Sequence, residues 1–157
     1  MRTRHAVLAA LAALASGCGG GGGGSRGGGG GAGGGGPAAY SWGVSQGLWG
    51  EERLTISENG EAHYHFVSAR RQPSVDRTVT LSAAELAPLR AATLRPEFCE
   101  LRSQRDGIPD EAMPTLEVQS AERTCKVTLW DGEWEDMAAA RPARDAIDQI
   151  IRRIKAG

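Results

Sequence analysis

This chain of 157 residues has little of several features on which functional assignments depend. It contains three histidines and three cysteines, and only one long apolar run, which lies at its N-terminus. No catalytic triad, paired catalytic carboxylates, phosphate-binding loop or complete set of metal ligands is recognisable in its motifs. After the first apolar run, no segment approaches the length that spans a bilayer. The sequence therefore predicts no enzyme and no cofactor.

A basic surface of the kind that binds nucleic acid is also missing. Lys and Arg total 18 and Asp and Glu total 19. Arg2, Arg4 and Arg26 precede Pro37, so the rest of the chain carries a net charge of about −4. Its excess of Arg over Lys is typical of a GC-rich genome. We expect no nucleic-acid partner.

The N-terminus has the pattern of a bacterial export signal that ends in a lipid-bearing cysteine. Residues 1–5 supply a positive start, and residues 6–15 form an apolar run of the length that an export signal needs. The run ends in LASGC at residues 14–18, which resembles the lipobox of bacterial lipoproteins. Ala15 stands where leucine is most often found. The resemblance implies that a peptidase cuts before Cys18 and that this cysteine carries lipid, including palmitate.

Glycine dominates the next segment. Residues 19–36 are almost pure glycine, so they have no side chains to bury and much backbone entropy to lose on folding. We predict that residues 18–39 are the lipidated cysteine and a flexible tether, whose Gly-rich part has a root-mean-square span of roughly 23 Å. Residues 1–17 are then the signal peptide and residues 40–157 a single domain. The alternative is an ordinary secretory signal that happens to precede a cysteine.

These features place the protein on the bacterial cell membrane, outside the cytoplasm, with the lipid as its anchor. Gly19 rather than Asp follows the cysteine, which favours the outer membrane in a Gram-negative cell. The cysteine count agrees with export, because lipidation of Cys18 leaves Cys99 and Cys125 as a pair in an oxidising compartment. We predict a disulfide between them. Two free buried thiols are the alternative.

A β-hairpin is the first element that the domain's sequence predicts. Residues 53–57 and 62–67 are rich in β-formers and flank a turn at residues 58–60. A three-residue loop with Gly60 in the left-handed region aligns Leu54 with Tyr64. This register gives one apolar face and an outer face that carries His63 and His65.

The remaining elements complete an α+β fold. We expect a third strand at residues 77–81, a helix from a Ser82–Glu85 capping box to about residue 94, and a second hairpin at residues 115–120 and 123–130. A final helix opens at Pro142 and carries an apolar stripe of Ile147, Ile150, Ile151 and Ile154. The prediction is an antiparallel sheet of about five strands in ββ(β)αββα order, with two helices on one face.

Several common residue types in this region have a recurrent spacing: Leu81-Ser82, Glu85-Leu86, Leu89, Phe98, Gly107, Asp110 and Ile150-Ile151. With the second hairpin and the terminal helix, this spacing resembles small bacterial domains of the emfourin-like protease-inhibitor type, over about 75 residues. The resemblance implies a protease as partner. It matches no diagnostic motif of inhibition, so no residue role is carried over.

His63 and His65 are the candidate metal ligands. Two histidines two apart on a strand point to the same side, where they could bind Zn or Cu with a third ligand. The sequence identifies no third ligand, and a solvent-facing pair is the alternative. The acidic stretch at residues 131–136 lacks EF-hand spacing and is predicted to be a solvated loop.

Trp42, Trp49 and Trp134 are the candidate binding residues. They flank the predicted strands, and exposed aromatic rings at a sheet rim would suggest a surface for protein or glycan. Core packing is the alternative. Residues 43–47 match G-x-S-x-G, but Ser45 opens the domain and precedes an antiparallel hairpin, which is not the context of a nucleophile elbow.

Together these patterns predict a non-catalytic lipoprotein of the bacterial envelope whose domain binds another protein, with a protease as the partner that the resemblance names. The alternative function is a metal-dependent envelope enzyme that uses His63 and His65.

Overall fold

Six antiparallel strands form one sheet in the computed structural model, which describes residues 38–46, 50–68, 73–106 and 111–157. These residues belong to the compact unit Gly33–Gly157. The strands lie in the order β4-β3-β2-β1-β5-β6. Their bounds are β1 Ala38–Gln46, β2 Gly50–Ser57, β3 Glu61–Ser68, β4 Val75–Thr80, β5 Thr115–Gln119 and β6 Thr124–Thr128.

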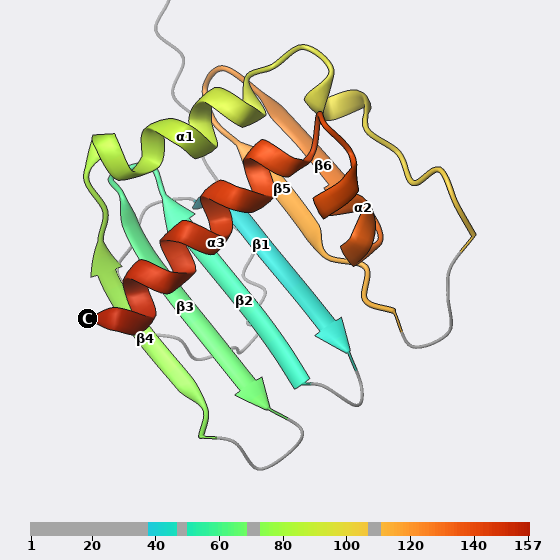
Figure 1. Cartoon of the computed structure of the whole chain (residues 1–157). Helices are drawn as coiled ribbons and strands as arrows, with labels where there is room; N and C mark the ends of the chain where they lie inside the picture. Colours follow the sequence, from blue (N-terminus) through green and yellow to red (C-terminus); the bar gives the residue numbers. More distant parts are fainter. Residues whose placement is uncertain (1–37, 47–49, 69–72, 107–110) are drawn as a thin grey trace, which may run out of the picture. The chain divides into compact units, whose positions relative to one another are not determined.

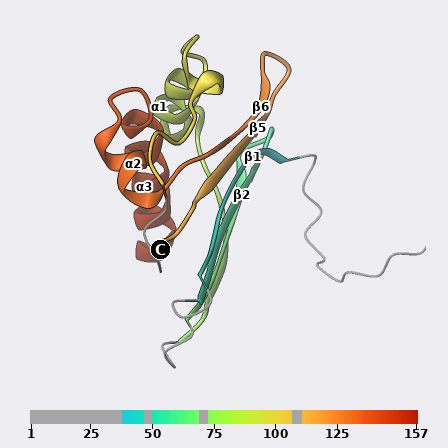
Figure 2. The same ribbon diagram turned by 90° about the vertical axis from the view of Figure 1, so that its right-hand side faces the viewer.

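The helices cover one face of this sheet (Figure 1). They are α1 Ala83–Thr93, α2 Asp131–Asp136 and α3 Arg141–Ala156, with a 3-10 turn η1 at Phe98–Glu100. Figure 2 shows α1, α2 and α3 on the same side of the sheet, so no helix of the described residues lies over the opposite face. In the described part of the chain, no helix has both the length and the hydrophobicity needed to cross a membrane.

The first hairpin has the predicted register. Leu54 pairs with Tyr64 and Ile56 with Ala62, and Gly60 has φ 86°. A slip of one residue would turn the apolar side chains of a strand to the outer face. The register is therefore held by the burial of these apolar side chains in the core. All four of these paired side chains lie in the core, where at most 1% of each residue is exposed.

The second hairpin and both predicted helices are also confirmed. Leu116 pairs with Val127 and Val118 with Cys125. At the start of α1, the Glu85 backbone N–H donates to the Ser82 hydroxyl oxygen and the Ser82 backbone N–H donates to the Glu85 carboxylate, which completes the capping box. The isoleucine stripe of α3 is buried against the sheet: Ile147, Ile150, Ile151 and Ile154.

The predicted number and order of strands were wrong, because β1 was not recognised. This strand occupies the centre of the sheet, between β2 and β5. Its sequence AAYSWGVSQ contains three β-formers, Tyr40, Trp42 and Val44, but its other six residues are Ala, Ser, Gly or Gln. It also directly follows the glycine-rich segment, and so it was not recognised as a strand. Tyr40 and Trp42 nevertheless alternate toward the core, opposite Val118 and Leu116.

The prediction of two helices was also wrong. Residues 131–136 form α2 rather than a solvated loop. Glu133 and Trp134 are buried while Glu135 and Asp136 are exposed, so this short helix is amphipathic over a single turn and a half. Six residues are too few for a periodic pattern to be read from the sequence.

Candidate functional site

A cleft of about 480 Å³ lies between α1 and one end of the sheet. Figure 1 shows how α1 crosses this end of the sheet. The walls of the cleft come from the start of β1, the β2–β3 turn, the first turns of α1 and the β5–β6 turn. The apolar part of its lining includes Tyr40, Leu81 and Leu86. Its polar part includes Glu58, Arg90 and Glu122. A mainly apolar recess with a few charged groups at its mouth is typical of a binding site.

The β2–β3 turn forms one wall because it packs directly onto the chain before α1. Gly60 N–H donates to the Ser57 carbonyl at 3.0 Å, and Leu81 N–H donates to the Gly60 carbonyl at 2.9 Å. A Cβ at position 60 would lie 2.5 Å from the Leu81 carbonyl oxygen, and the residue's φ is positive. Only glycine allows this close approach, so the turn and the start of α1 are held together.

The opposite wall depends on an ion pair between α1 and the β5–β6 turn. The capping box fixes where α1 begins, and Leu86 and Arg90 are four residues apart, which places them on one face of the helix. Arg90 then donates to the Glu122 carboxylate, with 3.2 Å between Nε and Oε2. This hydrogen bond raises the pKa of the Arg90 guanidinium. The pair bridges two elements that are 32 residues apart in sequence.

The charges that line the cleft do not balance. Arg90 is its one lining cation among the described residues, and Glu122 pairs with it. Glu58, at the tip of the β2–β3 turn, is exposed and forms no ion pair within the described part of the chain. The cleft therefore has an excess of one negative charge at its mouth.

The structure places His63 and His65 together on the outer face of the sheet, on either side of Asp76. His63 Nε2 lies 2.8 Å from Asp76 Oδ1, and His65 Nδ1 lies 3.0 Å from Asp76 Oδ2. Hydrogen bonds from His63, and then from His65, lower the pKa of the Asp76 carboxyl. Within residues 38–46, 50–68, 73–106 and 111–157, no three His, Cys, Asp or Glu side chains are grouped so that they could hold a metal ion.

Trp42 and Trp134 are core residues, so for these two candidates the structure has the alternative, core packing, and not an exposed binding surface. Trp42 is 2% exposed and Trp134 is fully buried. Trp134 Nε1 donates to the Pro114 carbonyl at 3.1 Å, and the Arg144 guanidinium lies 5.2 Å from the centroid of the Trp42 ring. Each ring thus has a partner inside the protein. Trp49, the third candidate, lies outside the described residues.

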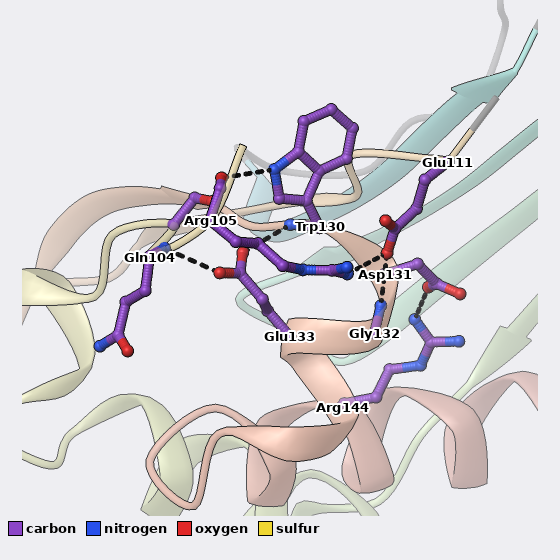
Figure 3. A network of polar contacts seen from close by, with 9 residues as sticks. Gln104, Arg105, Glu111, Trp130, Asp131, Gly132, Glu133 and Arg144 are labelled. Atoms are coloured by element: carbon purple, nitrogen blue, oxygen red, sulfur yellow. Dashed lines mark hydrogen bonds and ion pairs between the residues drawn. The ribbon is translucent and has the colours of Figure 1, made fainter. Parts of the chain in front are cut away.

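A polar network joins the start of α2 to the connection that precedes β5 (Figure 3). The buried Glu133 carboxylate accepts hydrogen bonds from the backbone N–H groups of Gln104, at 2.7 Å, and Trp130, at 3.1 Å. Glu111 accepts from Gly132 N–H at 3.1 Å and pairs with Arg105. Burial alone would raise the pKa of Glu133, but these hydrogen bonds hold it below the ordinary value. The network holds residues 104, 105 and 111 of this connection to the start of α2.

The predicted disulfide between Cys99 and Cys125 is present and joins η1 to β6, with 5.8 Å between the Cα atoms. Cys18 lies outside the described residues. Residues 43–46 of the G-x-S-x-G match belong to β1, which pairs in register with β2 and β5, so Ser45 is on a continuous strand rather than on an elbow. Gly47 lies outside the described residues.

Sequence reasoning missed the residues that line the cleft, as well as Asp76. The cleft combines four segments that are far apart in the chain, so no local motif could indicate it. Asp76 could have been found: it is a carboxylate immediately before the third predicted strand, and antiparallel pairing brings it opposite His65.

Comparisons with known proteins give no further guide to function. The chain matches no protein-family model, and no curated protein matches it.

Proposed function

We propose that this protein is a lipid-anchored binding protein of the bacterial cell envelope, whose non-catalytic α+β domain holds a second protein in its cleft. The observation that carries the binding role is the cleft between α1 and the two hairpin turns. It is mainly apolar and charged at its mouth, as binding sites are.

The location rests on the N-terminal pattern. The apolar run that ends at Cys18 and the glycine-rich segment behind it support lipidation followed by a tether. The disulfide between Cys99 and Cys125 supports an oxidising compartment, since such bonds are rare in the cytoplasm of most bacteria. In a Gram-negative cell, Gly19 favours the outer membrane. The emfourin-like spacing makes a protease the first partner class to examine.

The location is tested with the full-length protein expressed in a Gram-negative host. We expect wild type in the membrane fraction, with an acyl-bearing N-terminal cysteine by mass spectrometry, because the lipid is the anchor. Cys18→Ser should move the protein to the soluble envelope fraction, whereas Ser25→Ala, in the same segment, should not. Sedimentation of Cys18→Ser with membranes, together with a wild-type protein that lacks acyl mass, would contradict the location.

The binding role is tested in the same cells by photo-crosslinking. A photoreactive residue at Ala87, which lines the cleft, should give a discrete protein adduct. The same residue at Thr78, on the outer face of β4, is the matched control and should give none. Adducts of equal yield from both positions, or from neither, would contradict binding in the cleft.

A further inference from the structure

We infer that the cleft binds a basic side chain, arginine above all, presented by an apolar segment of the partner polypeptide. This inference rests on the proposed binding function and names the chemistry that the cleft selects. The occupant follows from charge complementarity between the cleft and its ligand.

The mouth of the cleft offers a carboxylate that nothing in the described structure neutralises. Glu122 is already paired with Arg90, whereas Glu58 forms no ion pair among the described residues. The backbone of the turn that carries Glu58 is held in place at Gly60, which keeps this residue at the edge of the recess. A cation that enters here meets an unpaired negative charge at a defined position.

The walls suit the rest of an arginine side chain. Leu81, Leu86 and the Tyr40 ring present apolar surface against which an aliphatic stem can pack while its charged head stays at the wet mouth. A guanidinium also stacks on aromatic rings and can pair with a carboxylate through two parallel hydrogen bonds. Arg90 and Glu122 close one side of the cleft with their ion pair, and Arg90 repels a cation that approaches from that side. The favoured approach is therefore across the β2–β3 turn.

Other surfaces are less suited to a charged ligand. On the outer face of the sheet, Glu51 pairs with Arg53, Glu117 with Lys126, and Asp76 with both histidines. Most carboxylates on that face therefore have a partner, with Glu61 as the exception among the described residues. Glu58 is the one carboxylate lining the cleft that has no ion pair within the described residues.

The test is a titration of the purified, isotope-labelled full-length protein in detergent, followed by NMR of its backbone amides. The probe is the peptide acetyl-Ala-Leu-Arg-Leu-Ala-amide, and its control replaces arginine with the neutral, near-isosteric citrulline. We expect the arginine peptide to shift amide signals of the cleft, including those of Gly60, Leu86 and Ala121. The citrulline peptide should bind at least about fivefold more weakly, because it lacks the charge-assisted hydrogen bonds.

Matched variants separate the site from general electrostatics. Ala87 and Ala84 are both exposed on α1, but only Ala87 lines the cleft. Ala87→Trp should abolish the shifts by filling the recess, and Ala84→Trp should leave them. Glu58→Gln should weaken binding about two- to fivefold, the range of an exposed ion pair, while Glu135→Gln, which removes the same charge from α2, should not. Thermal melting of each variant checks that the fold is retained.

Equal affinity for the arginine and citrulline peptides, or equal loss in Ala84→Trp and Ala87→Trp, would overturn the inference. The proposed function can fail separately. Crosslinks at Ala87 in cells without discrimination between the peptides would retain the binding role and reject the basic ligand. If the protein discriminates between the peptides but gives no crosslinks in cells, the preference for a basic side chain is retained and the proposed binding of a second protein in the envelope is rejected.

Discussion

Trp42 on β1 and Trp134 on α2 meet edge to face in the core, with ring centroids 5.2 Å apart and ring planes at 76°. Phe98 of η1 lies on another side of Trp134, at 6.5 Å between ring centroids. The three rings join the central strand, the short helix and the 3-10 turn. One buried indole thus holds together elements from three separate parts of the chain.

Replacing the Trp134 indole should destabilise the fold. We expect Trp134→Ala to lower the free energy of unfolding by about 3–5 kcal/mol, the usual loss for a large aromatic residue removed from a core. Trp134→Phe should lose less stability than Trp134→Ala, because it keeps an aromatic ring in the core. It still gives up the hydrogen bond from the indole N–H to the Pro114 carbonyl. Urea denaturation measures both variants, with the exposed Met113→Ala as control. A Trp134→Ala protein as stable as wild type would show that this contact is not structural.

The disulfide should contribute strongly to stability. Cys99 and Cys125 are 26 residues apart, and closing such a loop stabilises by about 3–4 kcal/mol in the chain-entropy model. Reduction should therefore lower the melting temperature of the oxidised protein. The double variant Cys99→Ala, Cys125→Ala should melt at the same temperature with and without reductant. Two free thiols in protein recovered from the periplasm would contradict the bond.

Glu133 predicts a loss of stability in acid. Its pKa is held below the ordinary 4.5 in the folded protein. As the pH falls below 4.5, the carboxyl therefore takes up a proton in the unfolded chain before it does so in the native state. The stabilisation is therefore present above pH 4.5 and is lost as the pH falls through the folded-state pKa. At about pH 7, Glu133→Gln should be less stable by about 1–3 kcal/mol, because one of the two backbone donors then faces an amide NH₂.

The difference in unfolding free energy between wild type and Glu133→Gln should become smaller as the pH is lowered toward about 3. Unfolding free energies measured across this range test it. Exposed Glu135→Gln is the control and should follow wild type at every pH. A gap that stays constant with pH would mean that the Glu133 carboxyl has the same pKa in the folded and the unfolded protein.

Asp76 should titrate at unusually low pH. Hydrogen bonds from His63 and His65 lower the pKa of its carboxyl below the ordinary 3.8, with His63 as the larger cause. Carbon-detected NMR of the carboxyl group should show this directly. His63→Ala should bring the pKa back toward 3.8 by a larger step than His65→Ala does. Equal steps, or an Asp76 that already titrates at 3.8 in wild type, would refute the two-histidine arrangement.

Local chemistry was enough to predict much of this fold. The turn at Gly60 set the register of the first hairpin, because only one loop length puts Leu54 and Tyr64 on the same side. Ser82 and Glu85 marked the start of α1 in the same way. In each case a few neighbouring residues determine the structure, so the signal lies within a short window of sequence.

Elements whose structure depends on distant partners were missed. β1 is a strand because β2 and β5 flank it, and α2 is a helix because Trp134 and Glu133 each find buried partners elsewhere. The same reason hid the cleft, whose walls meet only in the folded chain. A tryptophan beside a glycine looked like a rim residue, yet Trp42 lies on a central strand and its ring is buried in the core.

The position of β1 has a mechanical consequence. The chain enters the sheet at Ala38, at the start of a strand that pairs along its length with β2 and over residues 40–43 with β5. Backbone hydrogen bonds run perpendicular to antiparallel strands. Tension transmitted through the residues before Ala38 therefore pulls along the strand and loads both ladders at once, in shear. The same pull along an edge strand such as β4 or β6, paired on one side only, would load a single ladder.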